Sequence, residues 1–372
     1  MANMDVDDSS TSALAQPSVG PPLSDHRSDT LSDVLEVVRL TGALFFLVDA
    51  RTPWVAEAPA SPHLVPVILP SAQHVVSYHV VTEGPCWCES PGQAPLRLDT
   101  GDVLIVPHGH AYQLASMCGL RTGWTRADAL AWFRAMANGQ LPFVVTEGGN
   151  GSERVQLVCG FLGCDALPFN PVLTTLPSLL RVRVHGTSGP RLKSLLEFAV
   201  AESSQARAGS RSVLLRIAEL VFVEVLRSYL TTASEGEASC SWLGGLRDPV
   251  VGRALARLHA EPARAWTLPE LAREAGASRS VLAERFTSFV GHPPMLYLTR
   301  WRIQLAASRL TAGAAPVSAV ASEVGYESEA AFCRAFKKVT GVTPASWRSG
   351  RTRRQMAVEH AAEPSQRGTI GS

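Results

Sequence analysis

The sequence predicts a multidomain α and β protein: an N-terminal β-barrel, connector helices and a C-terminal all-α domain. Two observations indicate this division. Up to about residue 185, short apolar runs are separated by Gly and Pro, a texture typical of a sandwich or barrel built from short strands. From about Leu192 onward, apolar residues recur instead at helical spacing. A chain of 372 residues is also long enough for more than one hydrophobic core.

The β-rich domain is expected over residues 30–185. Its predicted strands follow the apolar runs at 44–48, 65–69, 75–81, 103–106, 155–158 and 179–184. Two apolar stripes, which start at Leu192 and Val213, predict connector helices within 186–232 that also mediate dimerisation. The remaining predictions are disordered ends at 1–29 and 350–372, a Ser-, Gly- and Glu-rich linker at 233–247, and the helical domain at 248–349.

Charge is distributed unevenly along the chain. The net charge is +1, but residues 253–354 contain sixteen Lys and Arg against seven Glu. This local excess predicts a polyanionic partner for the C-terminal domain only. The apolar run at 214–230 is interrupted by charged residues, and the N-terminus lacks the pattern of a signal peptide, so we expect a cytoplasmic protein that does not enter a membrane. The seven Cys are scattered and odd in number, which favours reduced thiols.

The C-terminal domain contains an internal repeat. In the first copy, an apolar helical stripe ends at Gly276, and Ser278 precedes a second stripe. In the second copy, Gly325 and Ser328 hold the same positions. Glycine allows the left-handed backbone that ends one helix, and serine caps the next helix. The repeat therefore predicts two helix-turn-helix units, the first with a capping box that starts at Thr267.

These residues resemble a known family. The segment from about residue 250 to 347 is similar to the DNA-binding domain of AraC/XylS-type transcriptional regulators, and residues 324–344 resemble its C-terminal signature. The resemblance implies that a long helix at 294–310 joins the two units, which read adjacent major-groove segments of double-stranded DNA. It is compatible with an activator, which would also contact RNA polymerase, or with a repressor.

Helical periodicity separates the buried faces of the two recognition helices from the faces that are free to contact DNA. The candidates for base contacts are Arg279, Ser280, Ala283, Glu284, Glu329, Ala330, Cys333 and Arg334. Arg334 is the best single candidate for guanine, and Glu284 could accept a hydrogen bond from cytosine. The candidates for phosphate contacts are Arg300, Arg302, Lys337 and Lys338. Phosphate contact by Arg334, and a surface salt bridge for Glu284, remain alternatives.

The β-rich half resembles a cupin-type ligand-binding domain. Residues 101–110 are similar to the second cupin motif, and 78–84 and 159–164 fit strands of the same barrel. The resemblance implies a small-molecule effector in the barrel, for which His79, Trp87 and His110 are candidate pocket residues. Catalytic cupins bind a metal through histidines and a glutamate. Ser77 stands where that glutamate would lie, so we expect no catalytic residues, cofactor or metal.

Three hypotheses follow. The first is a DNA-binding transcriptional regulator whose barrel senses a small molecule or mediates formation of a homodimer. The second is a metal-dependent cupin enzyme with a DNA-binding domain for autoregulation, against which the missing glutamate argues. The third treats the repeat as a protein-interaction module, which leaves the basic excess unexplained. The first hypothesis accounts for the most observations.

Overall fold

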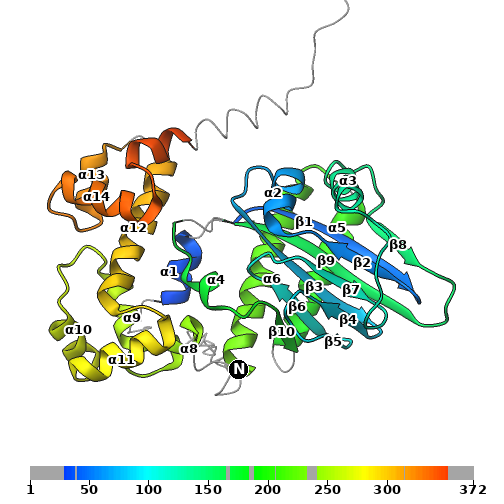
Figure 1. The fold of residues 1–372 in the computed structure, drawn as a ribbon, viewed down its shortest axis with the longest axis horizontal. Helices are drawn as coiled ribbons and strands as arrows, with labels where there is room; N and C mark the ends of the chain where they lie inside the picture. Colours follow the sequence, from blue (N-terminus) through cyan, green and yellow to red (C-terminus); the bar gives the residue numbers. More distant parts are fainter. Residues whose placement is uncertain are drawn as a thin grey trace, which may run out of the picture.

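The computed structural model describes residues 29–37, 40–164, 168–183, 188–205, 207–232, 241–313 and 315–350. Figure 1 shows a β-rich half and a helical half, with two short helices between them. These are α1 (Thr30–Val37) and α4 (Pro171–Thr175). The predicted multidomain α and β class is confirmed. The predicted disordered ends lie outside the described residues except at Asp29 and Gly350.

The β-rich half is built from two sheets. The larger sheet has the order β10 (Leu180–Arg183), β6 (Asp102–Val106), β3 (His74–Glu83), β9 (Arg154–Cys164), β1 (Leu40–Arg51) and β8 (Val144–Gly148). The smaller sheet has the order β2 (Val55–Ala58), β7 (Tyr112–Ala115), β4 (Cys86–Glu89) and β5 (Leu96–Leu98). Phe46 and Leu157 of the larger sheet share one buried cluster with Cys88 and Leu114 of the smaller. The two sheets therefore enclose a common interior.

Two helices interrupt the strands. The predicted strand at 65–69 is wrong, because most of this run lies in α2 (Ser61–Ile68). Pro62 occupies the first turn of α2, where proline's fixed φ favours a helix start, and Leu64 and Ile68 are buried four residues apart on one face. The second helix, α3 (Arg126–Ala137), begins at a capping box formed by Thr125 and Asp128.

The connector helices cover one face of the larger sheet. They are α5 (Ser188–Gln205) and α6 (Ser210–Thr232), which pack against each other and against β1 (Figure 1). None of the helices in the described part of the chain is long and apolar enough to cross a bilayer. The predicted linker is wrong over 241–247, where Ser241 caps α8 (Trp242–Arg247) and both Trp242 and Leu243 are completely buried. The rest of that linker, 233–240, lies outside the described residues.

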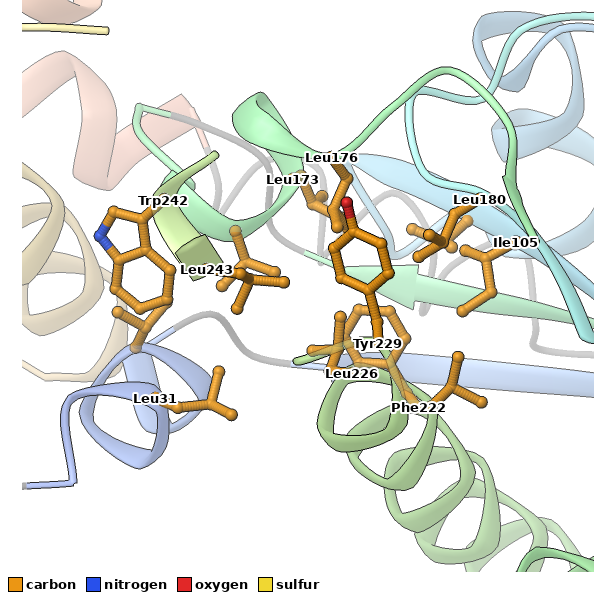
Figure 2. Packing of buried hydrophobic residues seen from close by; sticks show 14 of the residues in the cluster. Leu31, Ile105, Leu173, Leu176, Leu180, Phe222, Leu226, Tyr229, Trp242 and Leu243 are labelled. Atoms are coloured by element: carbon orange, nitrogen blue, oxygen red, sulfur yellow. The ribbon is translucent and has the colours of Figure 1, made fainter. Parts of the chain in front are cut away.

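One hydrophobic cluster joins the larger sheet to the helical half. Figure 2 shows Ile105 and Leu180 of the sheet, Leu226 of α6, and Trp242 and Leu243 of α8 within it. The same cluster continues into the first helix-turn-helix unit. The barrel, the connector and the first unit consequently share a continuous core.

The helical half follows the predicted repeat. Its helices are α9 (Val251–Ala260), α10 (Leu268–Ala275), α11 (Arg279–Val290), α12 (Pro294–Ala312), α13 (Val317–Glu323) and α14 (Glu329–Thr340). Gly276 and Gly325 both have left-handed backbone, with φ of +71° and +84°. Ser278 and Ser328 each accept a hydrogen bond from a backbone amide in the first turn of the following helix. The second unit has its own buried cluster, which contains Phe332 and Phe336.

Arg302 on α12 joins the two units. Its guanidinium donates to the carbonyl oxygens of Pro262 and Arg264, at 2.6 and 2.7 Å, in the loop before α10. It also donates to the carbonyl oxygen of Gly325, at 3.3 Å, in the turn of the second unit. Gly325 lies so close to this loop that a Cβ atom there would overlap the backbone of Ala263. We call these contacts the inter-unit joint.

Removal of the guanidinium should destabilise the helical half. We expect Arg302→Ala to lower the free energy of unfolding by about 3 kcal/mol, because three buried or half-buried carbonyl groups lose a charged donor. The control is Arg273→Ala, whose side chain is exposed on α10, with an expected change below about 0.5 kcal/mol. Urea denaturation of both variants measures the difference, and equal stabilities would contradict the joint.

The close approach at Gly325 gives a second prediction. Gly325→Ala should cost at least about 2 kcal/mol, because the new Cβ combines an unfavourable left-handed φ with overlap of the Ala263 backbone. Gly291→Ala is the matched control: its φ is +76°, but an added Cβ meets no atom within 4 Å. It should cost only about 1 kcal/mol. Thermal unfolding of the two variants compares them, and an equal loss would show that packing at the joint is unimportant.

Candidate functional site

The first recognition helix, α11, presents a polar face to solvent. Arg279, Ser280 and Glu284 are exposed and Ala283 is half-buried. Leu282 and Phe286 point inward and are completely buried. The serine cap at the start of α11 fixes which residues form its first turn, so local sequence sets the position of this face.

The second recognition helix, α14, has the same arrangement. Its outer face combines exposed and half-buried residues that the sequence singled out: Glu329, Ala330, Cys333 and Arg334. Lys337 and Lys338 are exposed in its last turn. Within the described part of the chain, Arg334 and both lysines form no hydrogen bond or ion pair through their side chains. This end of the molecule therefore presents unpaired positive charge, as a surface that meets phosphate does.

Two of the predicted phosphate contacts, Arg300 and Arg302, lie on α12 and not on a recognition helix. Arg302 does not fit the prediction, because its half-buried guanidinium is taken up by the inter-unit joint, and burial lowers its pKa. Arg300 is also half-buried, with Nη1 2.6 Å from Nε2 of His292 and its guanidinium 5.9 Å from the Phe169 ring centroid. Both guanidinium groups contact residues outside α12, and helical periodicity within α12 could not indicate these contacts.

The interior of the barrel contains a cavity of about 120 Å³ between the two sheets. Residues of β1, β2, β3, β7 and β9 form its walls, and α3, β8 and the chain around Trp124 border it. Seven aromatic side chains line it: Phe46, Trp54, Tyr112, Trp124, Trp132, Phe133 and Phe161. The cavity is therefore suited to an apolar guest of about the size of one ring.

A buried polar cluster lies on the wall of this cavity. His79 Nδ1 is 3.0 Å from Cys159 Sγ, and His79 Nε2 is 2.5 Å from the Tyr112 hydroxyl. Strand pairing places these groups together, since His79 stands opposite Cys159 in the register of β3 and β9. Burial lowers the pKa of His79 to about 3 and raises the pKa of Cys159 well above its usual value. At neutral pH, both side chains are therefore uncharged.

Of the three residues predicted to line an effector pocket, one lies at this cavity. His79 lines the cavity, whereas Trp87 and His110 are not among its lining residues, so a role for those two in effector binding stays a prediction. His110 is exposed and its ring lies 5.6 Å from that of His108. The seven aromatic residues of the lining were missed. The adjacent aromatic residues Trp132 and Phe133 were the one sequence feature that could have indicated a buried apolar site, because large aromatic side chains tend to be buried.

The histidines and cysteines of the barrel make structural contacts. His74 Nε2 is 2.6 Å from the carbonyl oxygen of Pro107, and His108 Nε2 is 2.8 Å from that of Leu176. No group of three His, Cys, Asp or Glu residues in the described ranges is arranged to hold a metal ion. Cys86 and Cys88 are free and buried, and burial raises the thiol pKa of each to about 12. Cys159 and Cys164 are buried as well.

Comparison with known proteins identifies both halves. The cupin family model matches residues 29–231, and a helix-turn-helix domain model matches residues 271–350. A putative AraC-like transcription regulator of Streptomyces antibioticus is 32% identical over 321 residues, covering 86% of this chain and 98% of that protein. The regulator AlkR of Acinetobacter baylyi is 24% identical over 322 residues, covering 86% and 99%.

Solved structures are more distant. The fatty-acid-bound ToxT of Vibrio cholerae has a TM-score of 0.30 and 12% identity, over 83% of this chain and 95% of that chain. The family assignment therefore rests on the domain matches and on the extended similarity to the Streptomyces protein. The chain belongs to the AraC family of transcriptional regulators, with a cupin domain ahead of its helix-turn-helix domain.

Proposed function

We propose that this cytoplasmic regulator binds a small apolar effector in the barrel cavity, and that binding changes how its two recognition helices meet DNA. One observation carries the proposal. The sheet that borders the cavity, the connector helix α6 and the first helix-turn-helix unit share one hydrophobic cluster. Since protein interiors are close-packed, a displacement on one side of such a cluster changes packing on the other.

A second contact couples the cupin domain to α12. The backbone amide of Phe169, which follows β9, donates to Gln304 Oε1 at 2.9 Å, and Gln304 is 2% exposed. The Phe169 ring packs edge-on against Tyr297 at 5.6 Å. Because α12 carries both units, a shift of this segment would move both recognition helices relative to the cupin domain. A rearranged cupin domain would thereby change how the two helices meet DNA.

For DNA recognition, we assign base contacts to the outer faces of α11 and α14. Arg279, Glu284 and Arg334 have side chains that can read base edges, and Lys337 and Lys338 serve phosphates. An enzymatic role lacks support from the described residues. If the regulator activates transcription, RNA polymerase is a further partner.

Homodimerisation is the second part of the proposal. Phe198 of α5 and Leu220 of α6 are 52% and 51% exposed, on the helices that cover the sheet. The two helices pack against each other, and in the proposed dimer these exposed apolar side chains are buried against a second copy. A dimer would place four helix-turn-helix units on one operator.

Binding to the upstream DNA of the gene tests the first part. We expect Arg334→Ala to lose about tenfold in affinity for that site, with little change on unrelated DNA, because a bidentate guanine contact discriminates by about 1–3 kcal/mol. Lys338→Ala is the control and should weaken binding to all DNA equally, with a smaller salt dependence. Electrophoretic shifts at two salt concentrations measure both. Binding that is independent of salt, or absent on every DNA, would overturn the DNA-binding assignment.

Sedimentation tests the second part. Leu220→Glu should convert the dimer to a monomer, because a carboxylate in an apolar interface loses its hydration. Met117→Glu introduces the same charge at a residue that is 56% exposed outside α5 and α6, and should leave the dimer intact. A wild-type protein that sediments as a monomer at micromolar concentration would contradict the interface.

A further inference from the structure

The charged residues around the barrel cavity are all of one sign. Glu57 and Glu147 are part of the lining, whereas Lys and Arg are absent from the lining residues described by the structure. His79 also lines the cavity, but its depressed pKa keeps it neutral. A carboxylate guest would therefore meet two like charges and no cation, and water screens the half-buried Glu147 less than the exposed Glu57.

Glu147 is the more buried of these two carboxyl groups. It lies on the edge strand β8, where it stands opposite Ala50 in the register with β1, and it is half-buried. Within the described residues, its carboxyl group has no hydrogen bond or ion pair. Burial raises the pKa of Glu147, because the ionised form has lost water without gaining a partner. A positively charged guest would supply that partner.

The aromatic lining selects among cations. The faces of Trp and Tyr attract weakly hydrated cations, and Trp is the strongest of the aromatic residues in this interaction. Trp54, Trp124 and Trp132 all border the cavity. Trp54 is 3% exposed, so its indole ring belongs to the buried part of the wall. A small metal ion would gain little from such walls, whereas an alkylammonium group would contact them over its whole surface.

We propose that the effector is a small apolar cation, an amine or quaternary ammonium compound that carries alkyl or aryl groups. Its charged group lies among the tryptophans of the cavity and beside Glu147, and Glu57 provides a second negative charge. The cavity of about 120 Å³ accepts one ring-sized or trimethylammonium-sized group at a time. The inference deepens the proposed function and rests on it only in taking this cavity as the effector site.

Three probes, of which the cation and the neutral compound have the same shape, test the charge preference on the full-length protein. They are phenyltrimethylammonium, its neutral carbon isostere tert-butylbenzene, and benzoate as an anion. We expect the cation to bind at least tenfold more tightly than the neutral isostere, and benzoate to bind most weakly, as measured by isothermal titration and by quenching of tryptophan fluorescence. A neutral or anionic probe that binds as tightly as the cation would overturn the inference.

Variants locate the preference. Glu147→Gln should lower the affinity for the cation about tenfold and leave that for the neutral isostere unchanged, which separates a charge effect from a loss of shape. Glu153→Gln removes an exposed carboxylate at the start of β9 outside the cavity, and should behave like the wild type. Trp132→Leu should weaken both probes, and the cation more. An unchanged cation affinity in Glu147→Gln would overturn the placement of the charge.

The same titrations, repeated with DNA present, separate this inference from the proposed function. If a neutral probe binds best and also changes affinity for the upstream DNA, the regulator with an effector cavity stands and the cationic class falls. If no probe binds the cavity, the cationic class falls as well. If the cation binds as expected without any effect on DNA affinity, the cavity is a cation site but the coupling to DNA fails.

Discussion

The hydrophobic cluster between the larger sheet and the first helix-turn-helix unit is the contact on which the rest of the arrangement depends. It places Leu180 of the sheet, Leu226 of α6 and Trp242 of α8 in one continuous core (Figure 2). Two domains joined by a linker alone would move independently, since interfaces within a chain are commonly small and polar. Here the first helix-turn-helix unit packs against the larger sheet and α6 in the same core, so the position of that unit depends on how the sheet is packed.

The second unit is attached differently. Its own cluster centres on Phe332 and Phe336, and it reaches the first unit through the shared helix α12 and the inter-unit joint at Arg302. Beneath α12, the Tyr297 hydroxyl accepts from the indole N–H of Trp242 at 2.9 Å and lies 2.7 Å from His259 Nε2. Buried polar groups that bond to one another permit few alternative packings. This network therefore positions α12 against the first unit, and the apolar residues of α12 together with the inter-unit joint hold the second.

The two sheets of the barrel enclose an interior, and the barrel histidines lie within hydrogen-bond distance of carbonyl, thiol and hydroxyl groups. Aromatic side chains then occupy the space around the cavity. A site of this kind can recognise a guest by shape and charge, which is what a regulator requires of an effector.

The sequence by itself determined the features that depend on neighbours along the chain. The repeat with its turn glycines and capping serines, the outward faces of α11 and α14, and the β-to-α change of texture all arise from contacts within a few residues. Tertiary structure decided the rest. The apolar run at 65–69 was predicted as a strand but lies mostly in α2, because helix and strand patterns are alike over so few residues. Trp242 is buried in the core that joins the two halves, which the composition of the predicted linker does not reveal. The contacts of Arg302, and the position of Trp87 and His110 outside the cavity lining, could not be predicted for the same reason: whether a side chain meets DNA, a cavity or a backbone carbonyl depends on residues distant in sequence.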